Sequence, residues 1–349
     1  MHSDKKGNAM RNPDFNNLLK VLRREVPDRP TLFEFFLNDP LYERLAARTR
    51  APDGKPLEGH ARLIRAFANA GYDYVTTPGS DISFPYKEPP RGATISLNET
   101  ACITDRATFD AYQWPDPDAC DYSRLDTMAE LLPDGMKLVV NGPGGVIENV
   151  VFLTGYDNLC YMLVDDPRLV EDIFAAVGSR LVRYYEICAP HEAAGALISN
   201  DDWGFNTQTT LKPDDMRRYV FTWHKRIVEA IHAAGKPAIL HSCGNLEAVM
   251  DDVIDDMKYD GKHSFEDKIE PVEDAYERWG GRIAILGGID VDFVCRSTPD
   301  AIIVRSKAML ERAAERGGYA LGTGNSVPEY VPQDSYLAMI SAATGEDLR

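Results

Sequence analysis

Short apolar runs alternate along the chain with longer segments in which apolar residues recur at helical spacing. The runs predict eight strands, at residues 31–36, 72–77, 136–140, 195–199, 238–245, 259–264, 282–286 and 318–321. The helical segments are residues 13–24, 56–70, 155–193 (two helices), 213–234, 246–257, 271–279 and 299–316. Eight strands with helices between them predict an α/β protein with a single (β/α)8 TIM barrel, whose active site lies at the carboxyl ends of the strands.

An open doubly wound sheet would also carry polar residues at its strand ends. Residues 141–145 read Asn-Gly-Pro-Gly-Gly, which we interpret as a tight turn because no helix-opening phosphate fingerprint fits there. The number of units and the missing fingerprint favour the barrel.

The expected domain layout is a disordered segment at residues 1–12, followed by one barrel over residues 13–349. Residues 82–136 form an insertion after the second strand, and we expect them to lie over the barrel mouth. Long ordered insertions are often lids or binding loops, although a plain structural flap is the alternative. Within this insertion, residues 93–97 and 100–104 predict a hairpin.

Polar residues gather where the predicted strands end. Asp201, Asp202 and Asp81 are candidate catalytic residues, because a carboxylate at a barrel mouth can carry protons or bind substrate. For the first two, a helix cap and a turn are the alternative reading. Candidate substrate-binding residues at the other strand ends are Glu34, Asn141, Asp290 and Asn325.

His241 and Cys243 stand two residues apart at the end of the run 238–245, so on a strand their side chains face the same side. An imidazole and a thiol directed together suit a borderline-soft metal such as zinc. The alternative is a buried thiol beside a hydrogen-bonded histidine. Two ligands are fewer than a catalytic zinc site needs.

The charge balance narrows the range of partners. The 349 residues include 38 Lys and Arg and 55 Asp and Glu, a net charge of −17, which opposes binding to nucleic acid and to anionic membrane surfaces. The six cysteines are widely spaced without a Cys-x-x-Cys pair, so we expect a reducing cytoplasm and no disulfide framework. No signal peptide and no membrane-length apolar run is visible.

Several stretches resemble the uroporphyrinogen decarboxylase superfamily. They are Val-Pro-Asp-Arg-Pro at 26–30, Asn-Asp-Asp-Trp at 200–203, Lys-Pro at 212–213, His-Ser-Cys-Gly-Asn at 241–245 and Gly-Gly-Ile-Asp at 287–290. The resemblance covers the chain from about residue 13 and is closer to the methylcobamide:thiol (coenzyme M type) methyltransferase branch.

True uroporphyrinogen decarboxylases carry an Arg-Gln-Ala-Gly-Arg loop after the first strand, whose arginines hold substrate carboxylates. This chain has Phe-Glu-Phe-Phe at 33–36 instead, although Ser80, Asp81 and Ile82 resemble the motif that carries the decarboxylase's central aspartate. The resemblance therefore implies that this chain does not decarboxylate uroporphyrinogen.

In the methyltransferase branch, a His-x-Cys pair and a distant cysteine in the last strand region bind zinc. His241 and Cys243 match the pair, but residues 322–326 contain no cysteine, so the third ligand is open. His263, at the next strand end, is the first candidate for this metal ligand. Asp201, Asp202 and Glu34 are the others.

The resemblance implies an enzyme: a zinc-dependent methyltransferase that moves a methyl group between a small substrate and a corrinoid (cobalamin) carrier. Its expected partners are a corrinoid protein and a small methyl donor or acceptor, and a homodimer is compatible with it. One alternative is a decarboxylase or lyase for a carboxylated substrate, which arginines at the mouth would favour; Arg91 is the obvious candidate. The other is a barrel that only binds a ligand.

Overall fold

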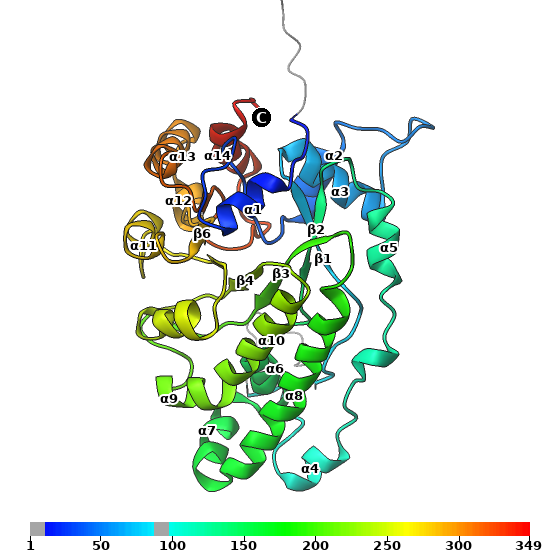
Figure 1. The fold of residues 1–349 in the computed structure, drawn as a ribbon, viewed down its shortest axis with the longest axis vertical. Coiled ribbons are helices and arrows are strands. Elements are labelled where there is room, and N and C mark those ends of the chain that lie inside the picture. The colour runs from blue at the N-terminus through cyan, green and yellow to red at the C-terminus, as the bar shows by residue number, and fades with distance from the viewer. Residues whose placement is uncertain (1–10, 87–97) are drawn as a thin grey trace, which may run out of the picture. The chain divides into compact units, whose positions relative to one another are not determined.

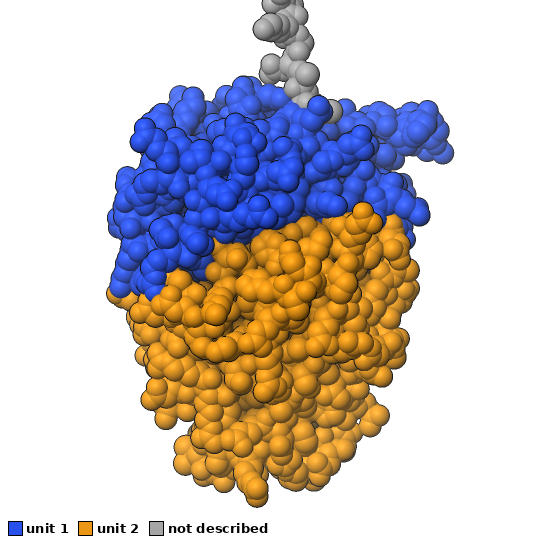
Figure 2. Space-filling view, in the orientation of Figure 1, with its two compact units in different colours: residues 1–76, 127–138, 261–349 blue, residues 77–126, 139–260 orange. Residues whose placement is uncertain are grey.

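The computed structural model describes residues 11–86 and 98–349 (Figure 1). Most of the N-terminal segment expected to be disordered, Arg91 and the first arm of the predicted hairpin, residues 93–97, lie outside the described residues. The chain forms two compact units (Figure 2). Unit 1 comprises the described parts of 1–76, 127–138 and 261–349, and unit 2 comprises those of 77–126 and 139–260.

Within the described residues, seven strands form one sheet in chain order. The strands are β1 (Tyr74–Pro78), β2 (Lys137–Asn141), β3 (Ala194–Asn200), β4 (Ala238–His241), β5 (Gly261–His263), β6 (Ala284–Leu286) and β7 (Tyr319–Ala320). Pairing is parallel between β3 and β4, between β5 and β6, and between β6 and β7. An α/β fold whose strand order equals the chain order agrees with a barrel-type architecture.

The prediction of an eighth strand at residues 31–36 was wrong. Leu32 makes one isolated parallel bridge to Leu321, flanked by hydrogen bonds from Phe33 N to Leu321 O and from Leu321 N to Thr31 O, both 2.8 Å. The ladder stops at Glu34, because its backbone N–H and C=O both bond to the Tyr74 hydroxyl at 2.6 Å. A side chain from another element therefore occupies the groups that a longer strand would use.

Unit 1 contains most of the early and late helices of the chain. They are α1 (Asn16–Leu22), α2 (Asp39–Ala46), α3 (Gly59–Ala70), α11 (Val272–Trp279), α12 (Val291–Arg296), α13 (Pro299–Ala313) and α14 (Gln333–Thr344). Caps set several of their ends: Asn38 accepts the Leu41 N–H at the start of α2, and Thr298 accepts the Ala301 N–H at the start of α13. The sequence pattern had not predicted α2, α12 or α14.

Unit 2 contains the described helices from the middle of the chain. They are α4 (Arg106–Ala111), α6 (Val146–Thr154), α7 (Tyr156–Asp165), α8 (Pro167–Cys188), α9 (Pro213–Asp215) and α10 (Thr222–Ala233), with a π-helical turn, η2, at Met216–Phe221. Short turns η1 (Pro117–Ala119), η3 (Glu247–Val249) and η4 (Asp252–Asp256) complete it. Helices α8 and α10 approach closely, since a Cβ at Gly178 would lie 2.2 Å from the Trp223 ring. Among the described helices, none is long and apolar enough to cross a membrane.

The segment 82–136 contains short helices, including α4, η1 and α5 (Ser123–Ala129). Residues 100–104, predicted as the second arm of a hairpin, form no strand. The reason is that the N–H groups of Cys102 and Ile103 both bond to Leu153 O at the end of α6, at 2.8 Å. That this segment lies over the mouth stays a prediction.

Candidate metal centre

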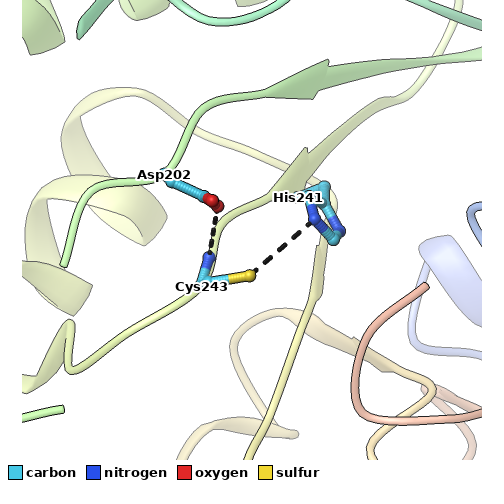
Figure 3. Close-up of side chains that lie close together, drawn as sticks. All are labelled: Asp202, His241 and Cys243. Carbon is cyan, nitrogen blue, oxygen red and sulfur yellow. Dashed lines mark hydrogen bonds between the residues drawn. The ribbon is translucent and has the colours of Figure 1, made fainter. Parts of the chain in front are cut away.

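Three side chains with metal-binding atoms meet where β3 and β4 end. Asp202 follows β3 by two residues, His241 is the last residue of β4, and Cys243 lies two residues further on. The register pairs Asn200 with His241, so the two strands end level with each other. One possible ligand atom from each of the three residues lies within 4.8 Å of the others (Figure 3).

The position of Cys243 differs from the prediction, which placed this residue on the strand, before a Gly-Asn turn at residues 244–245. The strand ends at His241, and the loop after it turns at Gly244, whose φ of 88° is left-handed. Gly244 is also packed against backbone, because a Cβ there would lie 2.2 Å from the Gly204 carbonyl carbon. The thiol therefore reaches its place through a tight turn, and its Sγ lies 4.0 Å from His241 Nε2.

Hydrogen bonds hold the two ligand-bearing segments together. Asp201 N donates to His241 O at 2.9 Å, and Trp203 N donates to Ser242 Oγ at 3.2 Å. Figure 3 shows the third bond, in which Cys243 N donates to Asp202 Oδ1 at 3.2 Å. Asn245 N continues the contact by donating to Phe205 O at 2.8 Å. Residues 201–205 and 241–245 thus form one bonded pair of loops.

The donor set fits a catalytic zinc ion. Zinc bonds of about 2.0–2.3 Å in tetrahedral geometry place ligand atoms about 3.5 Å apart, so the 4.0 Å between Sγ and Nε2 needs only a small movement. His241 is buried, Cys243 is half-buried and Asp202 is exposed, so the group faces solvent on one side. Three protein ligands with an open side are the usual arrangement for catalysis.

Asp201, next to the candidate ligand, has a different environment. Its side chain is completely buried, and its two oxygens accept four hydrogen bonds. The donors are Ile147 N (3.0 Å), Glu148 N (3.0 Å), Trp203 Nε1 (2.9 Å) and His224 Nε2 (2.8 Å). Two of these are orphan N–H groups in the first turn of α6, so Asp201 anchors that helix. Its predicted catalytic role stays untested.

His224 extends this buried network. Its Nδ1 lies 3.1 Å from Ser199 Oγ and 2.8 Å from the Tyr259 hydroxyl, and the ring is fully buried. His224 is not among the candidate site residues predicted from the sequence. Its spacing of three, four and seven residues from Ile227, Val228 and Ile231 places it on the buried face of α10, which is the signal that could have found it.

Glu148 is a further group that the sequence analysis missed. Its Oε2 accepts a hydrogen bond from Gly145 N at 3.0 Å, which caps the start of α6. Burial raises the pKa of Glu148, and the negative charges of Asp201 and Asp202 raise it further. A carboxyl that resists ionisation therefore lies close to the candidate metal ligands.

Two other predicted site residues belong to unit 2. Asp81 is exposed and forms an ion pair with Arg124. Asn141 ends β2; its carbonyl accepts the Tyr184 hydroxyl at 2.6 Å, and its Nδ2 donates to Gly142 O at 3.3 Å. Their functional roles stay predictions.

The remaining predicted residues belong to unit 1. Asp290 caps α12 by accepting Phe293 N at 2.9 Å, and its other oxygen accepts Asp267 N at 2.9 Å. Asn325 Oδ1 accepts Ser326 N at 2.7 Å. Both residues line a cavity of about 670 Å³ together with Phe36, Phe265, Glu266, Lys268, Val291, Asp292, Cys295, Gly324, Ser326, Pro328, Tyr330 and Pro332.

Glu34 and His263 both approach Thr323. The Glu34 carboxyl bonds to the Thr323 N–H and hydroxyl, and His263 Nε2 lies 3.3 Å from Thr323 O. The candidate metal-binding group described above contains Asp202 as its third member, whereas His263 as a metal ligand stays an untested prediction.

The sequence and the fold of this chain are similar to those of known proteins. The family model described as uroporphyrinogen decarboxylase (URO-D) matches residues 103–345. A methyltransferase from Methanosarcina mazei is similar at 17% identity, covering 94% of this chain and 97% of that chain with a TM-score of 0.67. A putative vitamin-B12 independent methionine synthase from Listeria monocytogenes is similar at 11% identity, covering 91% and 98% with a TM-score of 0.51. These two structures show the fold alone, and no curated protein matched the chain.

Proposed function

Because this chain belongs to the uroporphyrinogen decarboxylase family, we propose that it is a zinc-dependent methyltransferase. It moves a methyl group between a small substrate and a corrinoid carried by a partner protein. The observation that carries the proposal is the group of Asp202, His241 and Cys243, whose nitrogen, sulfur and oxygen donors suit zinc.

The roles of the side chains follow from their contacts. Bound zinc would act as a Lewis acid towards the heteroatom that gives up or receives the methyl group. Asp202 has two roles in this scheme, because the carboxylate that binds metal also accepts the Cys243 N–H. Asp201 accepts two N–H groups at the start of α6, which fixes the position of its own segment. The adjacent ligand Asp202 is therefore held in place before the substrate binds.

A combined metal and turnover assay tests the proposal. Elemental analysis of the purified protein is expected to find about one zinc ion per chain. Methyl transfer between free cobalamin and a panel of methyl ethers, thioethers and amines is then followed by the visible spectrum of the corrinoid. Protein that binds no metal and transfers no methyl group in either direction would refute the proposed function.

A decarboxylase or lyase is the second candidate function, because the matching family is described as uroporphyrinogen decarboxylase. For uroporphyrinogen itself, we expect no reaction. Phe33 and Glu34 are completely buried and Phe35 is nearly so, in the segment where the family's decarboxylases carry substrate-binding arginines. Incubation with uroporphyrinogen, beside a genuine decarboxylase as a positive control, is expected to give no coproporphyrinogen. Its formation at a rate near that of the control would contradict this prediction.

A further inference from the structure

The cavity of about 670 Å³ in unit 1 has an acidic lining. Its charged members are Glu266, Asp290, Asp292 and Lys268, so carboxylates outnumber ammonium groups by three to one. A volume of this size lies within the usual range of small-molecule sites, roughly 300–1,000 Å³. The field of several carboxylates on a concave surface favours a positively charged ligand.

The aromatic residues of the same cavity are Phe36, Phe265 and Tyr330. One face of the Phe265 ring is covered by the Lys262 ammonium, whose Nζ lies 4.1 Å from the ring centroid. Phe36 and Tyr330 are instead 47% and 72% exposed, although burial of such large side chains would stabilise the fold. These two rings are therefore available to a ligand in the cavity, together with the carboxylates.

A buried network fixes the wall that carries most of the charge. Arg305 donates to both carboxylate oxygens of Asp267, through Nη1 at 2.6 Å and through Nη2 at 2.8 Å. Asp267 N in turn donates to Asp290 Oδ2 at 2.9 Å. Glu266 and Lys268 are the two neighbours of Asp267 in the chain, so the bonds of Asp267 hold the backbone on which both lining side chains stand.

The backbone leading into this wall is strained. Ser264 has a φ of 87°, a left-handed value that residues other than glycine rarely adopt. Lys262 Nζ donates to Ser264 O at 2.5 Å, and Phe265 N donates to Gly324 O at 2.9 Å, so bonds on both sides hold this conformation. Such strain persists where the surrounding structure enforces it, and it is common at ligand sites. The cavity wall is therefore formed before any ligand binds.

We propose that this cavity binds a small organic cation of the methylated ammonium class. The methyl groups of such a cation carry positive charge and pack against aromatic faces, here those of Phe36 and Tyr330, while the carboxylates supply the opposite charge. An anion would face three carboxylates, and a metal ion would gain little from the two rings. The site consists of unit 1 residues, so its test needs neither the metal-binding group of unit 2 nor methyl transfer.

Isothermal titration calorimetry of the full chain tests the chemical class of the ligand. Choline and tetramethylammonium are expected to bind. The neutral alcohol 3,3-dimethyl-1-butanol has the shape of choline without its charge and should bind on the order of 10-fold more weakly than choline. The anion 3,3-dimethylbutanoate should not bind. The affinity for choline should fall as the ionic strength rises, because salt screens the carboxylates.

Two variants with matched controls test the location of the site. Tyr330→Ala and Asp292→Asn are each expected to weaken choline binding by about 2- to 5-fold, since each removes one partially solvated contact. Tyr161→Ala is the control for the first, because Tyr161 on α7 is 69% exposed and belongs to unit 2. Asp300→Asn is the control for the second, because Asp292 and Asp300 are both exposed in the first turn of a helix of unit 1. Both controls should bind choline as the wild type does.

Three results would overturn the proposal. They are no binding of either cation at millimolar concentration, binding of the neutral or anionic analogue as tight as that of choline, and wild-type affinity in both Tyr330→Ala and Asp292→Asn. Circular dichroism verifies that each variant is folded. Because binding is measured without turnover, a failure here leaves the proposed methyl transfer unaffected, and a failure of methyl transfer leaves this site unaffected.

Discussion

Asp201→Ala is expected to destabilise the fold by on the order of 4 kcal/mol, because it leaves a set of buried donors without an acceptor. Each such donor costs roughly 1–3 kcal/mol, with incomplete additivity. The donors are Ile147 N, Glu148 N, Trp203 Nε1 and His224 Nε2. Urea denaturation followed by circular dichroism measures the loss.

The neighbouring residue provides the control for this experiment. Asp202 is exposed, so Asp202→Ala in metal-free protein is expected to change stability by no more than about 0.5 kcal/mol. If the free energy of unfolding of Asp201→Ala lies within about 1 kcal/mol of the wild-type value, Asp201 is not the anchor of α6 that its contacts indicate.

Cys243→Ser and His241→Ala are expected to lose bound metal and to abolish methyl transfer while leaving the circular dichroism spectrum nearly unchanged. Loss of an outer hydrogen bond at a metal site costs roughly 10–100-fold in affinity, and loss of a ligand should cost more. The fold should survive, because the core around β3 and β4 consists of completely buried apolar residues such as Ile198, Ile239 and Leu240. Metal content and cobalamin-linked activity are the measurements.

A second thiol in unit 2 serves as the matched control. Cys160 lies on α7 and is half-buried, and Cys160→Ser should keep both metal and activity. Full activity in Cys243→Ser and His241→Ala, with no metal in the wild type, would end the zinc hypothesis.

The third ligand is decided by comparing two further variants. Asp202→Ala is expected to lose metal because its carboxylate belongs to the described group, and His263→Ala is expected to retain it. The reverse result would establish His263, the candidate from the sequence, as the ligand. Both variants are measured by zinc content per folded chain.

The sequence predicted the α/β class and the positions of seven strands because apolar runs report burial directly. The runs at 195–199 and 282–286, for example, correspond to β3 and β6. The predicted strand at 31–36 is reduced to one bridge, because the hydroxyl of Tyr74, 40 residues away from Glu34, takes its backbone groups. The local sequence pattern does not show that a distant tyrosine hydroxyl competes with strand pairing for these backbone groups.

The His-x-Cys pair was also visible in the sequence, since two residue types that both bind zinc stand at a predicted strand end. Their approach depends on a turn at Gly244 that packs against Gly204, which strand periodicity does not describe.

By itself, the sequence determined which residue types gather at the strand ends, because burial and periodicity are local properties of the chain. The tertiary structure alone decided their roles. It buried Asp201 under α6 and left Asp202 exposed beside Cys243, although the two aspartates are adjacent. It also joined Glu34 to Thr323 across 289 residues. Such differences arise because hydrogen-bond partners and desolvation depend on which distant segments meet, and a linear pattern does not specify those meetings.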